Sequence, residues 1–181
     1  MFKQSGIYSF ANLPVIVTDS KNHVSTQEDT TEWVKTAVMA SGGAMLVNTT
    51  GSVETIREFG LDVKRELSDA GGPTIVIDLS AVDILTPEEL VGLLYHEAGH
   101  AKLHMHGVEE SPEKEIDADN YAISKGVSRA VMGSMLTKLI KSVGVTQLQA
   151  QGLTEKEAGI HIAGMLATEP SYLARMANFA A

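Results

Sequence analysis

The stretch TPEELVGLLYHEAGHAKLHMHG, residues 86–107, is the most clearly predicted helix of the chain. Thr86 is a good N-cap residue, Pro87 suits the first helical position, and Glu89 stands three residues after the cap. These residues form a capping box, and no further proline interrupts the stretch before Gly107. Four of the six histidines of the chain fall within it. Which of them share one face of the helix decides what this segment can bind.

Two of these histidines lie four residues apart, with a glutamate directly after the first. His96, Glu97 and His100 form the pattern HExxH. On a helix both imidazoles point to the same side and can bind one ion. Glu97 can then reach a water in the open position of that ion and accept its proton. The pattern therefore predicts a zinc site with a catalytic carboxylate. The alternative is a helix whose two histidines only pack or cap.

A zinc hydrolase needs a third protein ligand, and two further histidines are candidates. His104 lies eight residues after His96, which is about 12 Å along a straight helix and too far to share an ion. His106 has the offset of the pattern HExxHxxGxxH. Leu103 stands where that pattern has the glycine that turns the chain back toward the ion. His106 therefore stays open as a ligand but is disfavoured.

The third candidate lies in the next predicted helix, where Glu115 and Asp119 are four residues apart. A loop with a proline separates this helix from His100, so the helix can return antiparallel. Glu115 could then bind the ion, while Asp119 accepts a hydrogen bond from a ligand imidazole. An acidic face in contact with water is the alternative, and the preceding HExxH favours the ligand interpretation.

The composition restricts the class of protein. The chain has 181 residues, 44% of them hydrophobic, which suits one domain over residues 1–181. It has no cysteine, so only His, Asp or Glu can hold a metal. The net charge of −9, without a basic stripe, argues against a nucleic-acid partner. We find no signal peptide and no apolar run that could cross a membrane, and expect a soluble cytoplasmic protein of unpredicted oligomeric state.

Hydrophobic periodicity predicts strands first and then helices only, which indicates an α+β fold with a small, mostly antiparallel sheet packed on a helical core. The predicted strands are residues 13–19, 44–48 and 74–82. The predicted helices are residues 29–43, 52–69, 86–107, 113–125, 128–143, 154–167 and 171–179.

Three stretches resemble the gluzincins, and most closely the minimal catalytic domains related to the M48 metallopeptidases. They are PTIVIDLSAVDILTPEELVGLLYHEAGH (residues 73–100), EIDADNYAISKG (115–126) and LATEPSYLARMANF (166–179). The resemblance covers residues 73–181 as a zincin core and leaves residues 1–72 unassigned. Glu169 departs from the family, which usually has a histidine before this proline. The ImmA/IrrE-like regulatory proteases are similar to the same region.

The resemblance implies a metallopeptidase that binds one Zn²⁺ and hydrolyses peptide bonds. Its ligands would be His96, His100 and Glu115, with Glu97 as general base and Asp119 as the partner of His96. It also implies an edge strand at residues 74–79 that pairs with a protein or peptide substrate. The alternative function is a catalytically silent or single-partner regulatory binding module with the same fold.

Further residues are candidates for contact with the substrate or its oxyanion. Tyr121 and His161 could donate a hydrogen bond to the oxyanion, as could Tyr172. Arg175 matches the C-terminal segment of the family. We expect Tyr121 to pack between helices and His161 to lie in the core or at a helix cap, because apolar residues flank it.

Overall fold

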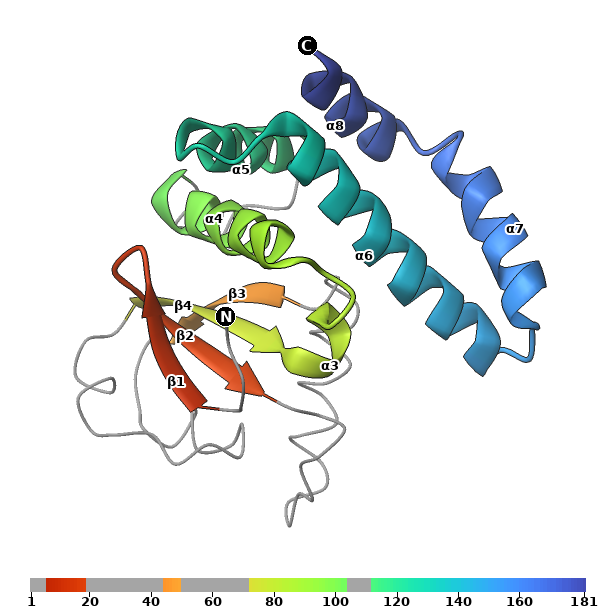
Figure 1. Cartoon of the computed structure of the whole chain (residues 1–181), viewed down its shortest axis with the longest axis horizontal. Coiled ribbons are helices and arrows are strands. Elements are labelled where there is room, and N and C mark those ends of the chain that lie inside the picture. The colour runs from red at the N-terminus through yellow and green to blue at the C-terminus, as the bar shows by residue number, and fades with distance from the viewer. Residues whose placement is uncertain (1–5, 19–43, 50–71, 104–111) are drawn as a thin grey trace. The chain divides into compact units, whose positions relative to one another are not determined.

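The structure is a computed structural model that describes residues 6–18, 44–49, 72–103 and 112–181 (Figure 1). The chain divides into two compact units, Met1–Asp83 and Ile84–Ala181. The strand that begins at Gly72 belongs to the first unit. The single domain over residues 1–181 stays a prediction. The helices predicted at residues 29–43 and 52–69 lie outside the described residues.

The first unit contains a four-stranded mixed sheet with the order β1-β2-β4-β3. The strands are β1 (Gly6–Phe10), β2 (Leu13–Thr18), β3 (Ala44–Thr49) and β4 (Gly72–Asp78). The pairs β1–β2 and β3–β4 are antiparallel, and the pair β2–β4 is parallel. The strands predicted at 13–19 and 44–48 are confirmed, while the strand predicted at 74–82 ends at Asp78 because the helix α3 (Leu79–Val82) follows.

The predicted edge strand at residues 74–79 is wrong. β4 is an inner strand, hydrogen-bonded to β2 on one side and to β3 on the other. Over Ile75–Ile77 both sides of β4 are already paired, so a substrate peptide has no free edge there. The side chains of Val15, Val17, Ile75 and Ile77 lie on one face in register and are fully buried. Pairing between distant strands has no local sequence signal, so the sequence does not show that β4 is an inner strand.

The sequence does not predict the hairpin that joins β1 to β2. Its two turn residues, Ala11 and Asn12, have φ angles of 50° and 65°. Two positive φ angles in a two-residue loop are the geometry that matches the twist of the flanking strands. Asn is common in such a turn, but alanine rarely adopts a positive φ, so the sequence lacks the usual hairpin signal.

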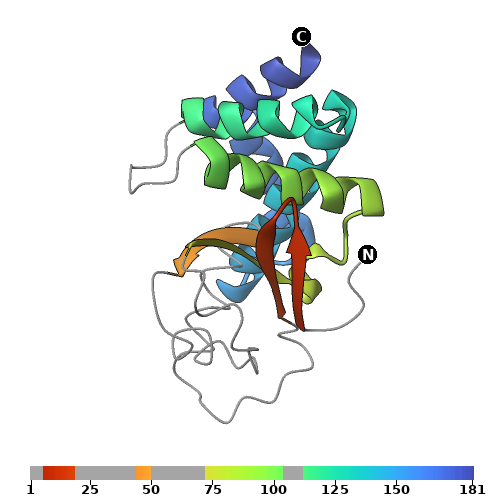
Figure 2. The same ribbon diagram turned by 90° about the vertical axis from the view of Figure 1, so that its left-hand side faces the viewer.

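The second unit consists of five helices within the part of the chain that the structure describes. They are α4 (Pro87–Leu103), α5 (Pro112–Ser124), α6 (Arg129–Ala150), α7 (Glu155–Leu166) and α8 (Pro170–Ala180). α4 lies beside α5, and α8 contacts both α5 and α6 (Figures 1 and 2). Strands followed by helices confirm the α+β class. None of the helices in the described ranges is long and apolar enough to span a bilayer.

The helices predicted after residue 107 are all present, but α6 continues past its predicted end at Val143. Gly144 suggests a stop in the sequence. In the structure it is a contact point with α7, where an added Cβ would lie 2.3 Å from Cδ1 of Ile162. Packing of α7 against this glycine therefore accounts for a residue that local propensity disfavours in a helix.

The start of α4 is held by the predicted capping box. The backbone N–H of Thr86 donates to Oε2 of Glu89 at 2.8 Å, and that of Glu89 donates to Oγ1 of Thr86 at 3.2 Å. The sequence did not show that Glu89 is buried and also joins α4 to α6. Its carboxylate accepts hydrogen bonds from Ser134 at 2.6 Å and Lys138 at 2.7 Å.

Glu89→Gln is expected to destabilise the protein by about 1 kcal/mol at neutral pH, because it removes the charged partner of Lys138. Burial raises the pKa of Glu89, but the hydrogen bonds from Lys138 and Ser134 outweigh burial and lower it. A lowered folded-state pKa adds stability above the unfolded pKa, and this stability is lost as the pH falls through the folded pKa. Urea unfolding should therefore show a difference between wild type and variant at about pH 7 that narrows below about pH 4. A difference that widens in acid would contradict this assignment.

Candidate metal centre

Close contact between α4 and α5 brings the two halves of the site together. An added Cβ on Gly99 of α4 would lie 2.9 Å from Cα and 3.1 Å from the carbonyl oxygen of Ala118 on α5. Only glycine fits this distance, because the neighbouring atoms belong to the backbone of α5. The glycine lies between His96 and His100 in the motif, so the closest approach occurs where the two imidazoles leave α4.

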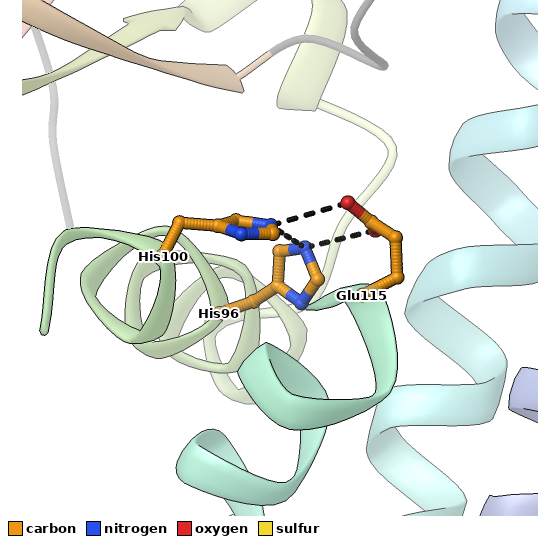
Figure 3. A group of neighbouring side chains, drawn as sticks. All are labelled: His96, His100 and Glu115. Carbon is orange, nitrogen blue, oxygen red and sulfur yellow. Dashed lines mark hydrogen bonds and ion pairs between the residues drawn. The ribbon is translucent and has the colours of Figure 1, made fainter. Parts of the chain in front are cut away.

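His96 and His100 from α4 point toward Glu115 from α5 (Figure 3). The two Nε2 atoms are 3.1 Å apart. Nε2 of His96 lies 3.4 Å from Oε2 of Glu115, and Nε2 of His100 lies 3.2 Å from Oε1. One ligand atom from each residue lies within 4.8 Å of the others.

The three side chains converge in the way that ligands of one zinc ion do. A tetrahedral zinc ion holds nitrogen and oxygen ligands at about 2.0–2.1 Å, which separates neighbouring ligand atoms by about 3.3 Å. The two Nε2 atoms, 3.1 Å apart, lie close to that separation, and Glu115 turns a different oxygen toward each imidazole, Oε2 at 3.4 Å from His96 and Oε1 at 3.2 Å from His100. Two imidazoles and one carboxylate are also a ligand set found in catalytic zinc sites. The structure thus brings together His96, His100 and Glu115, and their role as ligands stays a prediction.

Asp119 holds His96 in the orientation that a ligand needs. Its Oδ1 lies 2.8 Å from Nδ1 of His96, and its side chain is fully buried. Since an ionised carboxylate only accepts hydrogen bonds, Nδ1 carries the proton. In the neutral imidazole, Nε2 then has a free lone pair that faces Glu115 and His100.

Arg175 of α8 completes the group, in a place that differs from its predicted contact with substrate. Its Nε donates to Oδ2 of Asp119 and its Nη2 to Oδ1, each at 2.7 Å. Its Nη1 donates to Oε2 of Glu115, also at 2.7 Å. The guanidinium is buried and directed at two carboxylates.

The pKa values of His96, Glu115 and Asp119 are shifted in the directions that favour a positive charge between the carboxylates. Burial lowers the pKa of His96, but the hydrogen bonds to Asp119 and Glu115 outweigh burial and raise it to about 9. Burial raises the pKa of Glu115, yet its contacts with His100, His96 and Arg175 bring it well below the usual range. The pKa of Asp119 is lowered in the same way by His96 and Arg175, against the effect of burial. When His96 is protonated, its proton supplies the positive charge that a bound metal cation would otherwise supply.

Glu97 is a buried carboxylate that no described residue contacts through a hydrogen bond or ion pair. It is 7% exposed, and burial raises its pKa. A buried acidic group without a partner is costly, so such a group indicates a ligand or a function. A water or a substrate group held beside the two histidines would give it a partner.

No hydrogen bond or ion pair between described residues joins Tyr121, His161 or Tyr172 to the cluster. Tyr121 packs beside Gly99, with Nζ of Lys125 4.9 Å from the centre of its ring. His161 is exposed on α7, so the expected core or cap position is wrong. The Tyr172 hydroxyl lies 3.0 Å from Oγ1 of Thr137 and links α8 to α6. His104 and His106 lie outside the described residues.

Two features of the site were missed in the sequence. The approach of α5 to Gly99 has a signal, a glycine inside a predicted helix, which often marks close packing. The contact of Arg175 with both carboxylates has no local signal, because 56 residues separate it from Asp119.

Comparison of the chain with protein-family models, with curated proteins and with solved structures found no significant match. A function for the chain is therefore inferred from the geometry and chemistry of the second unit.

Proposed function

We propose that the chain is a zinc-dependent metallopeptidase of the gluzincin type. The observation that carries the proposal is the triangle of His96, His100 and Glu115, beside a buried Glu97 that no described residue contacts through a hydrogen bond or ion pair. A site that only stores or senses a metal has no use for this carboxylate. A site that activates water needs a base at this place.

His96, His100 and Glu115 would hold the ion, and Asp119 would fix the tautomer of His96. Zinc bound there would supply Lewis acidity, which lowers the pKa of a water ligand and polarises the substrate carbonyl. Two neutral imidazoles and one carboxylate leave the site one net positive charge, which suits the negative charge that develops on the carbonyl oxygen.

Glu97 would act first as base and then as acid. Its carboxylate takes a proton from the attacking water as the new carbon–oxygen bond forms. It then gives this proton to the amide nitrogen as the carbon–nitrogen bond breaks, and the amine leaves neutral. The raised pKa of Glu97 favours the second step, because it brings the acid closer to neutral pH.

A zincin core over residues 73–181, similar to the M48-like minimal catalytic domains, is the fold that goes with this proposal. ImmA/IrrE-like proteases are the second family to consider, since they share the two motifs. A silent or single-partner binding module with the same fold is the alternative function. It predicts metal binding without any dependence of hydrolysis on Glu97.

The first test is the zinc content of the purified protein. The wild type is expected to hold about one zinc per chain, and Glu115→Gln should bind it about 10–100-fold more weakly, because a carboxamide is a poorer ligand. Glu113→Gln is the matched control, since Glu113 is an exposed glutamate of the same helix. Mass spectrometry of the native protein and competition with a chelator measure both quantities.

Undiminished zinc in Glu115→Gln would contradict the ligand set. It would favour His106 as the third ligand, which is the alternative that the sequence leaves open. A wild type that binds no zinc would end the proposal.

A further inference from the structure

Arg175 donates hydrogen bonds to both acidic members of the cluster, Glu115 and Asp119. It comes from α8, whereas the acidic residues come from α5. Each of its three nitrogens donates to a carboxylate oxygen at 2.7 Å. The side chain is 10% exposed, so water competes little with these bonds.

We propose that Arg175 is a positioning residue of the metal site, which makes the C-terminal helix α8 part of that site. The inference rests on the proposed function, in that it concerns the same zinc site. It differs from the role in substrate binding that the sequence predicts. Three of the five N–H groups of its guanidinium donate to Asp119 and Glu115.

The geometry assigns Arg175 an effect on two of the three ligands. Arg175 acts directly on the proposed ligand Glu115. Its Nη1 donates to Oε2 of the same carboxylate whose Oε1 faces His100. Through Asp119 it acts on His96, because a carboxylate held at both oxygens keeps Oδ1 in line with Nδ1. Arg175 thus reaches Glu115 directly and His96 through Asp119.

The planar shape of the guanidinium matters more than its charge. Nε and Nη2 engage both oxygens of Asp119 side by side, which is the two-point geometry that arginine offers and lysine lacks. A lysine at this position would keep the positive charge but could not hold Asp119 at two points and Glu115 at a third. A charge effect alone also has the opposite sign, because removing a cation would strengthen the binding of another cation.

α8 has other attachments, which provide a control. Arg129 of α6 donates to the backbone carbonyl of Asn178, and the Asn178 amide donates to Asn120 of α5 at 3.1 Å. Arg129→Met loosens α8 without removing a contact to Glu115 or Asp119. A comparison of variants at Arg129 and Arg175 therefore separates the docking of α8 from the positioning of the ligands.

The experiment compares Arg175→Lys, Arg175→Met and Arg129→Met with the wild type. Three quantities are measured on the full chain: zinc affinity by competition with a chelator, the visible absorption spectrum with Co²⁺, and the unfolding midpoint without metal. Both Arg175 variants are expected to bind zinc about 10–100-fold more weakly. Their Co²⁺ spectra should lose the intensity of a tetrahedral site. Arg129→Met should lower the unfolding midpoint and leave zinc affinity and the Co²⁺ spectrum close to wild type.

Wild-type zinc affinity in Arg175→Lys would overturn the proposal. A positive charge without the two-point contact of the guanidinium would then be enough to position the ligands. Unchanged or tighter binding in Arg175→Met would overturn it as well, and so would equal losses of zinc affinity in Arg129→Met and Arg175→Met. These results leave the proposed function intact, since the wild type still binds zinc. Absence of zinc from the wild type would instead end both the proposed function and this inference.

Discussion

Glu97→Gln is expected to slow peptide hydrolysis by a factor of about 10²–10⁴ while the protein keeps its zinc. Glutamine has nearly the same shape but cannot accept the proton of the attacking water or return it to the amine. Since Glu97 is not one of the three converging ligands, the metal content should not change. The measurement is the rate of cleavage of a mixed peptide library, with zinc content determined on the same samples.

Glu88→Gln is the control for this prediction, because Glu88 is an exposed glutamate of the same helix. It should retain wild-type rates. If wild type and Glu97→Gln cleave every peptide at the same rate while both hold zinc, Glu97 has no catalytic role and the binding-module alternative gains. If Glu97→Gln loses its zinc, the carboxylate contributes to the ligand set and the assignment of roles is wrong.

Gly99→Val is expected to abolish tight zinc binding and to destabilise the protein by about 1–3 kcal/mol. The Cβ alone would lie 2.9 Å from a backbone atom of Ala118, so α5 must move away from α4 to admit it. Glu115 moves with α5, and its distances to both imidazoles increase. Gly99→Ala should have a smaller effect of the same kind. Chelator competition and urea unfolding measure the two consequences.

The same two substitutions at Gly164 are the matched controls. Gly164 lies in α7, and an added Cβ there would meet no atom of the described residues within 4 Å. Alanine at that exposed helical position should stabilise the protein by about 0.5–1 kcal/mol, since glycine is a poor helix former. Zinc affinity should stay at the wild-type value. Tight zinc binding in Gly99→Val would show that the close approach of the two helices is not needed.

Much of the site could be predicted because its chemistry is local. His96 and His100 share a helix face through the 3.6-residue repeat, and the capping box at Thr86 and Glu89 fixes where that helix begins. The spacing of Glu115 and Asp119 puts both on one face of α5 in the same way. Interactions within a few residues follow from the geometry of one element and can be worked out without the rest of the chain.

Other features depended on contacts between residues far apart in the chain. Tertiary structure decided that β4 is an inner strand, that Gly99 is where α5 meets α4, and that Arg175 donates to Glu115 and Asp119. The sequence alone determined which residue types are available and which face of a helix they occupy. Only the folded chain decided which faces meet, because that choice depends on the packing of whole elements and not on the preferences of any single segment.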